Sequence, residues 1–206
     1  LTKKISELTP EIPIVSEENL DNKNNKNLNN FWLIDPIDGT YDYINNKNEF
    51  TINAALIINK KPFLGIISAP AKNRIFYSYE DKKCFEKKNN KEINLFEINS
   101  KSSTELKALS HSEKLSTEIS NIHKKFKVNN FQKMKSSYKF CVIAAGEYDL
   151  YAAEPRACEW DIAAGHAILQ HSGCVVTDFD NNEILYGKKD FKNTSLIIKG
   201  KFLANG

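Results

Sequence analysis

Short apolar runs and period-two alternation dominate the first half of the chain, and both patterns are typical of β-strands. Residues 31–34 are continuously apolar, as in a buried strand, and the turn-forming pair Asp35-Pro36 ends the run. Residues 1–8 suit the end of a helix, which prolines at positions 10 and 13 terminate. This half therefore predicts a largely antiparallel sheet with strands at residues 12–15, 31–34, 50–58, 62–67 and 74–79.

The second half mixes helices and strands without a regular alternation between them. Residues 113–126 predict a polar helix with a weak apolar stripe, and residues 160–170 predict a second helix. Ser136 and Ser137 can cap a third helix over residues 138–145. Further strands are predicted at residues 106–109, 149–152, 174–177 and 194–198.

A polar stretch at residues 100–103 separates the two halves and marks a subdomain boundary. We therefore expect an N-terminal sheet subdomain, residues 1–103, and a C-terminal α/β subdomain, residues 104–206. Because strands and helices occur together without a regular rhythm, the fold class predicted is α/β or α+β, a layered sandwich in two halves.

Composition narrows the class of protein. With 206 residues, of which 41% are hydrophobic and 27% charged, the chain has the balance of a globular protein. No apolar run approaches the roughly 20 residues of a transmembrane helix. A net charge of +3 with dispersed lysines argues against a nucleic-acid partner. The 4 cysteines are widely spaced without a zinc-binding pattern, so we expect a reduced, cytoplasmic protein. The chain starts at Leu1 without Met, and we expect upstream sequence in the natural protein.

The segment after the first buried strand carries the candidate chemistry. Asp35 and Asp38 flank Pro36 at the point where the chain leaves a rigid strand. A simple turn would account for the Asp-Pro and Asp-Gly pairs, but two converging carboxylates also suit a hard cation such as Mg²⁺. Gly39 lets the backbone approach a ligand closely, and Thr40 adds a hydroxyl. The segment therefore predicts a site for magnesium and phosphate.

Two other acidic residues fit the same site. Glu17 follows a short predicted strand and can reach a shared metal, although a solvated pair with Glu18 explains it equally well. Asp161 begins a helix that continues with small residues at 163–165, and this pattern indicates close packing against another element. An acid at such a position is ordinarily a helix cap, and a cap can also be a metal ligand.

These segments resemble the inositol monophosphatase superfamily of metal-dependent, lithium-sensitive phosphatases. Residues 35–40, preceded by Trp32, match one of its signatures, and Trp160-Asp161 followed by Ala-Ala-Gly matches the other in the expected order. The pairing of the two is much more specific than either alone. The resemblance implies a layered α/β/α/β/α sandwich of the inositol monophosphatase and fructose-1,6-bisphosphatase type, whose N-terminal helices have no counterpart in this sequence.

Within that superfamily the chain is similar to the CysQ-type 3'(2'),5'-bisphosphate nucleotidases. Residues 8–18 resemble the approach of that group to its first metal ligand, and residues 136–141 resemble its Ser-Ser-x-Lys-Phe-Cys segment. Lys135 departs from the pattern, because the group commonly has Gly there. A second departure is an N-terminal acidic residue that partners the family's threonine in activating water and that has no match here.

The resemblance implies roles for individual residues. Glu17, Asp38 and Thr40 would form the catalytic set, with Thr40 orienting the attacking water. The implied metal ligands are the carboxylates of Glu17, Asp35, Asp38 and Asp161 and the main-chain carbonyl of Ile37.

The implied substrate-binding residues are Gly39, Thr40, Ser137, Lys139 and Asp161. Lys139 would face a second phosphate of the substrate, and its alternative reading is an exposed helix lysine. Ser137 is the weaker candidate, since capping alone would explain it.

The activity that the resemblance implies is hydrolysis of 3'-phosphoadenosine 5'-phosphate to AMP and phosphate, which recycles a by-product of sulfate assimilation. The expected cofactor is Mg²⁺, roughly two or three ions, with inhibition by lithium. An inositol-1-phosphate or fructose-1,6-bisphosphate phosphatase on the same scaffold is the nearest alternative, and a non-catalytic nucleotide-phosphate binding relative is another. The expected partner is a small phosphate ester. A homodimer and a peripheral position at the cytoplasmic face of the inner membrane stay open.

Overall fold

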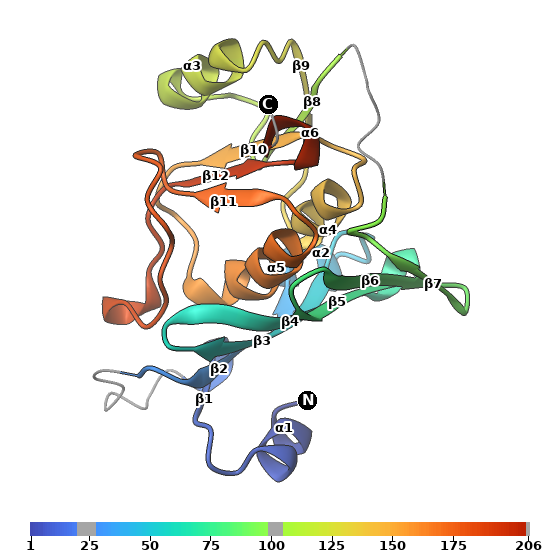
Figure 1. Cartoon of the computed structure of the whole chain (residues 1–206), viewed down its shortest axis with the longest axis vertical. Helices are drawn as coiled ribbons and strands as arrows, with labels where there is room; N and C mark the ends of the chain where they lie inside the picture. The colour runs from blue at the N-terminus through green and yellow to red at the C-terminus, as the bar shows by residue number, and fades with distance from the viewer. Residues whose placement is uncertain (20–27, 99–104, 205–206) are drawn as a thin grey trace.

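Two β-sheets with two helices between them organise the chain (Figure 1). The computed structural model describes residues 1–19, 28–98 and 105–204, and the expected boundary at residues 100–103 lies outside these ranges. The large sheet contains, in spatial order, β1 (Ile14–Ser16), β2 (Phe31–Asp38), β3 (Thr51–Ile58), β4 (Lys61–Ala69), β5 (Arg74–Glu80), β6 (Lys83–Lys88) and β7 (Lys91–Asn94).

The small sheet is built from the second half of the chain and has the strand order β11-β12-β10-β8-β9. β10 pairs in parallel with β8 and antiparallel with β12, so the sheet is mixed. Its strands are β8 (Lys107–Ser110), β9 (Asn130–Lys133), β10 (Leu150–Ala153), β11 (Val175–Thr177) and β12 (Leu196–Lys199).

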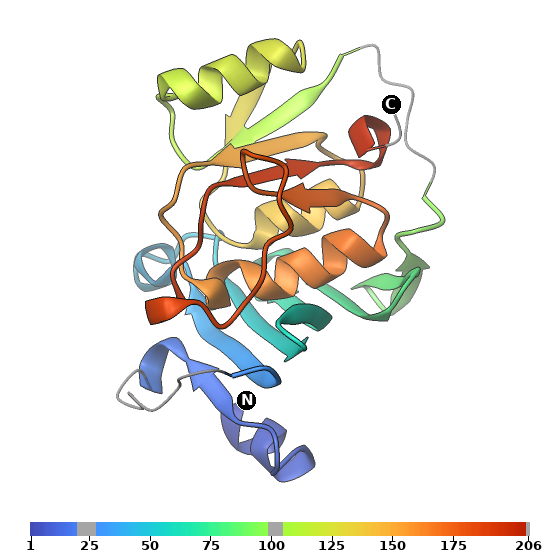
Figure 2. The same ribbon diagram turned by 60° about the vertical axis from the view of Figure 1, so that its left-hand side comes forward.

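Helices cover both sheets on both sides, which gives the five layers that the resemblance implied. α4 (Tyr138–Ala144) and α5 (Glu159–His171) lie between the sheets, α1 (Thr2–Leu8) lies on the outer face of the large sheet, and α3 (Thr117–Lys125) covers the outer face of the small one (Figures 1 and 2). Two short helices, α2 (Thr40–Ile44) and α6 (Lys201–Ala204), follow β2 and β12.

The central layer holds the main core because α5 is apolar around most of its circumference. A helix that is hydrophobic all round must be buried on every side, and α5 packs against strands of both sheets and against α4. A Cβ atom on Gly165 would lie 2.2 Å from the ring of Phe140 on α4, so only glycine allows the two helices to approach this closely. The close packing predicted from the small residues of α5 is therefore confirmed.

Three strands, β6, β7 and β9, were not predicted from the sequence. β7 and β9 are edge strands of the two sheets, and β9 is exposed along its whole length. An edge strand with both faces wet has no period-two apolar pattern to detect. The polar helix expected from residue 113 begins at Thr117, because the Ser116 hydroxyl accepts a hydrogen bond of 3.3 Å from the backbone N–H of Ile119 and caps it there.

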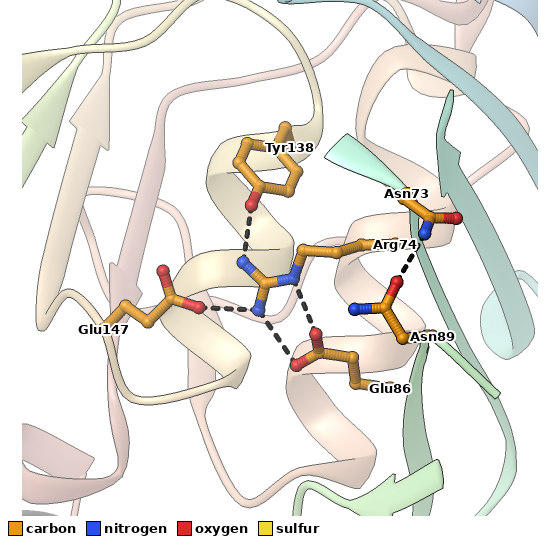
Figure 3. A network of polar contacts seen from close by, with 6 residues as sticks. All are labelled: Asn73, Arg74, Glu86, Asn89, Tyr138 and Glu147. Atoms are coloured by element: carbon orange, nitrogen blue, oxygen red, sulfur yellow. Dashed lines mark hydrogen bonds and ion pairs between the residues drawn. The ribbon is translucent and has the colours of Figure 1, made fainter. Parts of the chain in front are cut away.

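A buried arginine joins the large sheet to α4 (Figure 3). Arg74 on β5 makes two hydrogen bonds to Glu86 on β6, 2.6 Å from Nε to Oε1 and 2.9 Å from Nη2 to Oε2. It also donates to the hydroxyl of Tyr138, at the start of α4, and to Glu147 beyond the end of that helix, 2.6 Å away. Burial alone would lower the pKa of Arg74, but the hydrogen bonds to the two glutamates raise it overall. The charged guanidinium therefore holds both ends of α4 against the sheet.

We expect Arg74→Met to lower the free energy of unfolding by about 3–5 kcal/mol, because it leaves the carboxylate of Glu86 buried without its partner. Urea denaturation followed by circular dichroism measures this change. Lys61→Met is the matched control, since it breaks the solvent-exposed ion pair between Lys61 and Glu183 (2.8 Å) and should change stability by at most about 1 kcal/mol. Equal losses in the two variants would show that the Arg74 network does not hold the layers together.

Candidate active site

A bulge in β2 turns the two aspartates of the first motif toward the same face of the large sheet. Asp35 pairs with Asn53 on β3, and Asp38 pairs with Thr51. Between these two pairs β2 therefore contains one more residue than β3 does. In a regular strand residues at this odd spacing would point to opposite faces, and the extra residue reverses that. Pro36, which has no N–H for the ladder, lies inside the bulge. The strand therefore continues to Asp38, and the sequence-based expectation that it ends at residue 34 is wrong.

Asp161 enters the same space from the first turn of α5. Its Oδ2 accepts a hydrogen bond from the backbone N–H of Cys158 at 2.7 Å, so the helix-cap role is confirmed. Oxygen atoms of Asp35, Asp38 and Asp161 lie within 4.8 Å of one another. A cation with oxygen ligands at about 2.0–2.6 Å can contact atoms at such a spacing.

Glu17 lies at the rim of this cluster, at the start of the short 3₁₀ helix η1 (Glu17–Asn19) that follows β1. Glu17 remains exposed to solvent on one side. Its partial burial and the charges of Glu18 and Asp38 raise its pKa, whereas a side-chain hydrogen bond with Asp35 acts in the opposite direction. The parallel pairing of β1 with β2 brings it there. Glu17 is thus placed beside the other three carboxylates, although the motif itself gave no preference over a solvated pair.

The electrostatics of the cluster favour a cation. Burial raises the pKa of Asp35 to about 8, with further contributions from the charges of Asp38, Glu17 and Asp161. Burial and Asp38 raise the pKa of Asp161 to about 6. Oδ2 of Asp35 is buried and has no hydrogen-bond partner among the described residues. Since an orphaned carboxylate oxygen is costly in a protein interior, the donor set fits a hard divalent cation such as Mg²⁺.

The backbone of the loop after β2 requires glycine at position 39. Gly39 has a φ of 88°, and a Cβ atom there would lie 2.7 Å from the carbonyl oxygen of Glu49, so another residue would be strained and would clash. Thr40 starts α2, and its hydroxyl donates to the carbonyl of Ile37 at 3.0 Å. The Ile37 carbonyl keeps a second lone pair, and the Thr40 oxygen keeps its acceptor capacity toward solvent.

Ser137 has a different role from the cap that explained it in the sequence. It is the N-terminal flanking residue of α4, but its side chain makes no capping hydrogen bond. Its hydroxyl instead contacts the carboxylate of Asp38, and it lies 2.9 Å from the carbonyl oxygen of Asp161. The backbone N–H of Ser137 also donates to Asp38. Capping alone is therefore the wrong explanation, because this serine joins two of the clustered acidic residues.

Lys139 is buried on the first turn of α4, so the alternative of an exposed helix lysine is wrong. Only 6% of the residue is exposed. Its ammonium donates to the carbonyls of Lys135 and Ser136, both at 2.9 Å, which leaves one of its three N–H groups free. Burial lowers its pKa, whereas Asp38 and Asp161 act in the opposite direction. Lys139 lines a pocket that these two aspartates also line.

Two further residues at the site were missed by sequence analysis. Arg156 lines the same pocket as Lys139 and adds positive charge to it. One signal pointed to it, since Arg74 and Arg156 are the only arginines among the 29 basic residues. Asn53 lies on β3 and donates to the Ser137 hydroxyl at 2.9 Å. Nothing in its local sequence distinguishes it from an ordinary strand residue.

His166 has a structural position in the core. Nδ1 of His166 on α5 lies 2.9 Å from the hydroxyl of Tyr186, deep in the core. Burial lowers the pKa of His166 to about 3, so it stays neutral.

Among the residues that the structure describes, no helix has both the length and the apolar character needed to cross a membrane.

Comparison with known proteins agrees with this geometry. The model of the inositol monophosphatase family matches residues 1–204. The 3'(2'),5'-bisphosphate nucleotidase CysQ of Buchnera aphidicola subsp. Acyrthosiphon pisum is 35% identical over 189 residues, which cover 90% of this chain and 69% of that protein. The CysQ protein of Escherichia coli strain K12 is 30% identical over 184 residues, 89% of this chain and 73% of that one.

Solved structures show the same architecture. The crystal structure of CysQ from Bacteroides thetaiotaomicron superposes with a TM-score of 0.80 at 27% identity, covering 97% of this chain and 82% of that one. An IMPase of Thermotoga maritima gives a TM-score of 0.74 at 24% identity, covering 99% of this chain and 75% of that one, and supports the fold alone. The layered sandwich expected from the sequence is confirmed.

We expect Mg²⁺ to raise the melting temperature more at about pH 8 than at about pH 6. The folded protein holds a proton on Asp35 up to its pKa of about 8, whereas the unfolded chain loses it near pH 4. Without metal, the contribution of Asp35 to stability therefore falls as pH rises through this window, and Mg²⁺ must displace that proton to bind.

Thermal denaturation with and without Mg²⁺ across this pH range measures the effect. Asp35→Asn is the control, because without the titrating carboxyl the metal-free melting temperature should lose this part of its pH dependence. A magnesium effect of the same size at every pH would contradict the assignment of Asp35 to the cation site.

Proposed function

Since the chain belongs to the inositol monophosphatase family and its CysQ relatives span most of it, we propose that it is a Mg²⁺-dependent phosphatase that converts 3'-phosphoadenosine 5'-phosphate to AMP and phosphate. The observation that carries the proposal is that three carboxylates and two basic side chains meet at one place. Carboxylate oxygens of Asp35, Asp38 and Asp161 lie within 4.8 Å of one another, beside a pocket that Lys139 and Arg156 line. Such a site can hold a cation next to an anion.

In this proposal Asp35, Asp38, Asp161 and Glu17, with the carbonyl of Ile37, hold the metal, as roughly two or three ions. Bound there, Mg²⁺ supplies Lewis acidity to the phosphate and lowers the pKa of water. The raised pKa of Asp35 means that this carboxyl gives up its proton when the cation binds.

Gly39 and Thr40 are proposed to receive the scissile phosphate. Gly39, with its positive φ, turns the chain from β2 into α2 while packing against the main chain of Glu49, and Thr40 follows it as the first residue of that helix. Because Thr40 donates its proton to the carbonyl of Ile37, its oxygen is left to accept a hydrogen bond from the attacking water. Phosphoryl transfer asks mainly for positioning and charge neutralisation, and this loop can supply the positioning.

Lys139 and Arg156 are proposed to bind the second phosphate of the substrate. Two N–H groups of Lys139 are held by backbone carbonyls, so the ammonium is fixed in place with one donor free. The carboxylates of Asp38 and Asp161 line the same pocket. A bisphosphate would therefore place one phosphate at the cation site and the other against positive side chains. This favours the nucleotide over a monophosphate such as inositol 1-phosphate.

A cytoplasmic location belongs to the same proposal, as does inhibition by lithium. The four cysteines are all free thiols, as expected of a reducing compartment. A homodimer and a peripheral position at the inner membrane rest on the family resemblance alone and stay predictions.

The test of the function is phosphate release by the protein with Mg²⁺. Substrates run in parallel are 3'-phosphoadenosine 5'-phosphate, inositol 1-phosphate and fructose 1,6-bisphosphate. We expect kcat/KM to favour the nucleotide by at least about 10-fold and lithium to suppress release. Asp38→Asn should lower turnover by about 100-fold or more with an unchanged circular dichroism spectrum, because it weakens the cation site without opening a cavity.

The outcomes separate the competing functions. Preference for inositol 1-phosphate or fructose 1,6-bisphosphate would leave the proposed cation site in place but show that the substrate is not the nucleotide. Tight binding of the nucleotide without turnover would indicate a non-catalytic binding protein. Activity of Asp38→Asn within a few-fold of wild type would remove that residue from the site.

Lys139→Met should raise KM for the bisphosphate about 10-fold or more, and KM for a nucleoside monophosphate about 2-fold or less. The methionine keeps the volume of the buried stem, so the change isolates the ammonium. Lys133→Met, on the exposed strand β9, controls for a general loss of positive charge. Equal increases in KM for both substrates would exclude Lys139 from recognition of the second phosphate.

A further inference from the structure

Asn53 is a buried amide next to the carboxylate cluster. It lies on β3 directly opposite Asp35 of β2, on the face of the large sheet that is turned toward α5. Only 1% of the residue is exposed, and its Nδ2 lies 2.9 Å from the hydroxyl oxygen of Ser137. A buried polar side chain is costly unless it is hydrogen-bonded, and for Asn53 the bond to Ser137 meets part of this cost, since its Oδ1 has no partner among the described residues.

The hydrogen bonds around Ser137 have one consistent direction. Its hydroxyl contacts the carboxylate of Asp38 and the backbone carbonyl of Asp161, and both of these groups accept hydrogen bonds in the ionised site. A hydroxyl carries a single proton, which must therefore point toward these acceptors. The contact with Asn53 is then one that Ser137 accepts, so the amide N–H donates.

The hydrogen bonds of Ser137 connect α4 to three other elements of the fold. Asp38 comes from β2, Asn53 from β3, and Asp161 from α5. Ser137, which follows the loop into α4, is the point at which all three meet. Without the Asn53 donor, the Ser137 oxygen would lose the hydrogen bond that it accepts, and only its donor contacts with Asp38 and Asp161 would hold it.

We infer that Asn53 is a positioning residue of the cation site. By donating to the Ser137 oxygen, Asn53 holds this hydroxyl where it reaches both the carboxylate of Asp38 and the main-chain carbonyl of Asp161, and so supports the positions of the two ligand-bearing residues. The inference rests on the proposed metal-dependent function and deepens it. Partners of this kind, one bond removed from the ligands, typically change metal affinity by about 10–100-fold when they are lost.

The test measures Mg²⁺ affinity by isothermal titration calorimetry and by the magnesium-dependent rise in melting temperature, with no substrate present. Asn53→Ala should weaken Mg²⁺ binding by about 10-fold or more. Asn53→Leu, which fills nearly the same volume, should weaken it similarly and stands in where the alanine variant fails to fold. Ser78→Ala is the matched control: its hydroxyl is buried without a partner among the described residues, and affinity should not change.

A second measurement asks whether Asn53 acts through Ser137. In the Ser137→Ala background, Asn53→Ala should weaken Mg²⁺ binding by no more than about 2-fold, because the residue it orients is gone. An equal loss in both backgrounds would overturn the inference, as would a lower metal-free melting temperature with unchanged Mg²⁺ affinity. If the wild-type protein bound no Mg²⁺, the cation site of the proposed function would fail, and Asn53 with it.

Discussion

Crowding of carboxylates is the constraint on which the site depends. Oxygen atoms of Asp35, which is buried, and of Asp38 and Asp161, which are half-buried, lie within 4.8 Å of one another, and burial, followed by the neighbouring charges, raises the pKa values of Asp35 and Asp161. Such an arrangement is unfavourable in the absence of a cation, so the scaffold must hold the side chains in place against their own repulsion. The bulge of β2 and the buried start of α5 accomplish this, since neither backbone can relax without disturbing the central core.

The two halves of the molecule are joined by contacts that converge on α4. Arg74 holds this helix to the large sheet from one side, through residues near both of its ends (Figure 3). From the other side Ser137 contacts Asp38 and Asp161. The helix that carries Lys139 is therefore fixed relative to the clustered carboxylates. The ion pairs of Arg74 in the core and the hydrogen bonds of Ser137 at the site both hold α4 in this position. Rigid support of this kind is what preorganised sites require.

The sequence alone was sufficient to predict the elements that have a regular hydrophobic pattern and the site residues that stand in a distinctive local motif. A continuous apolar run identified the start of β2, and Asp35, Gly39 and Asp161 stand in motifs whose chemistry can be read locally. The bulge was invisible, because it depends on how β2 pairs with β3 and not on β2 alone. Ser137 was misread and Asn53 missed for the same reason, since their partners are distant in the sequence. Edge strands such as β9 escaped because neither of their faces is buried.

The layout of the site also sets what must be folded before the site is complete. Ser137 and Asp38 are 99 residues apart in the sequence, so their contact closes a long loop and costs more chain entropy than a hairpin of the large sheet. The hairpins of the large sheet are local and can form first, leaving the sheet's apolar inner face uncovered until α4 and α5 dock. A chain in which α4 and α5 have not docked lacks the contacts of Ser137 with Asp38 and so has no complete cation site. A cation that binds only the docked chain therefore stabilises the docked state by mass action.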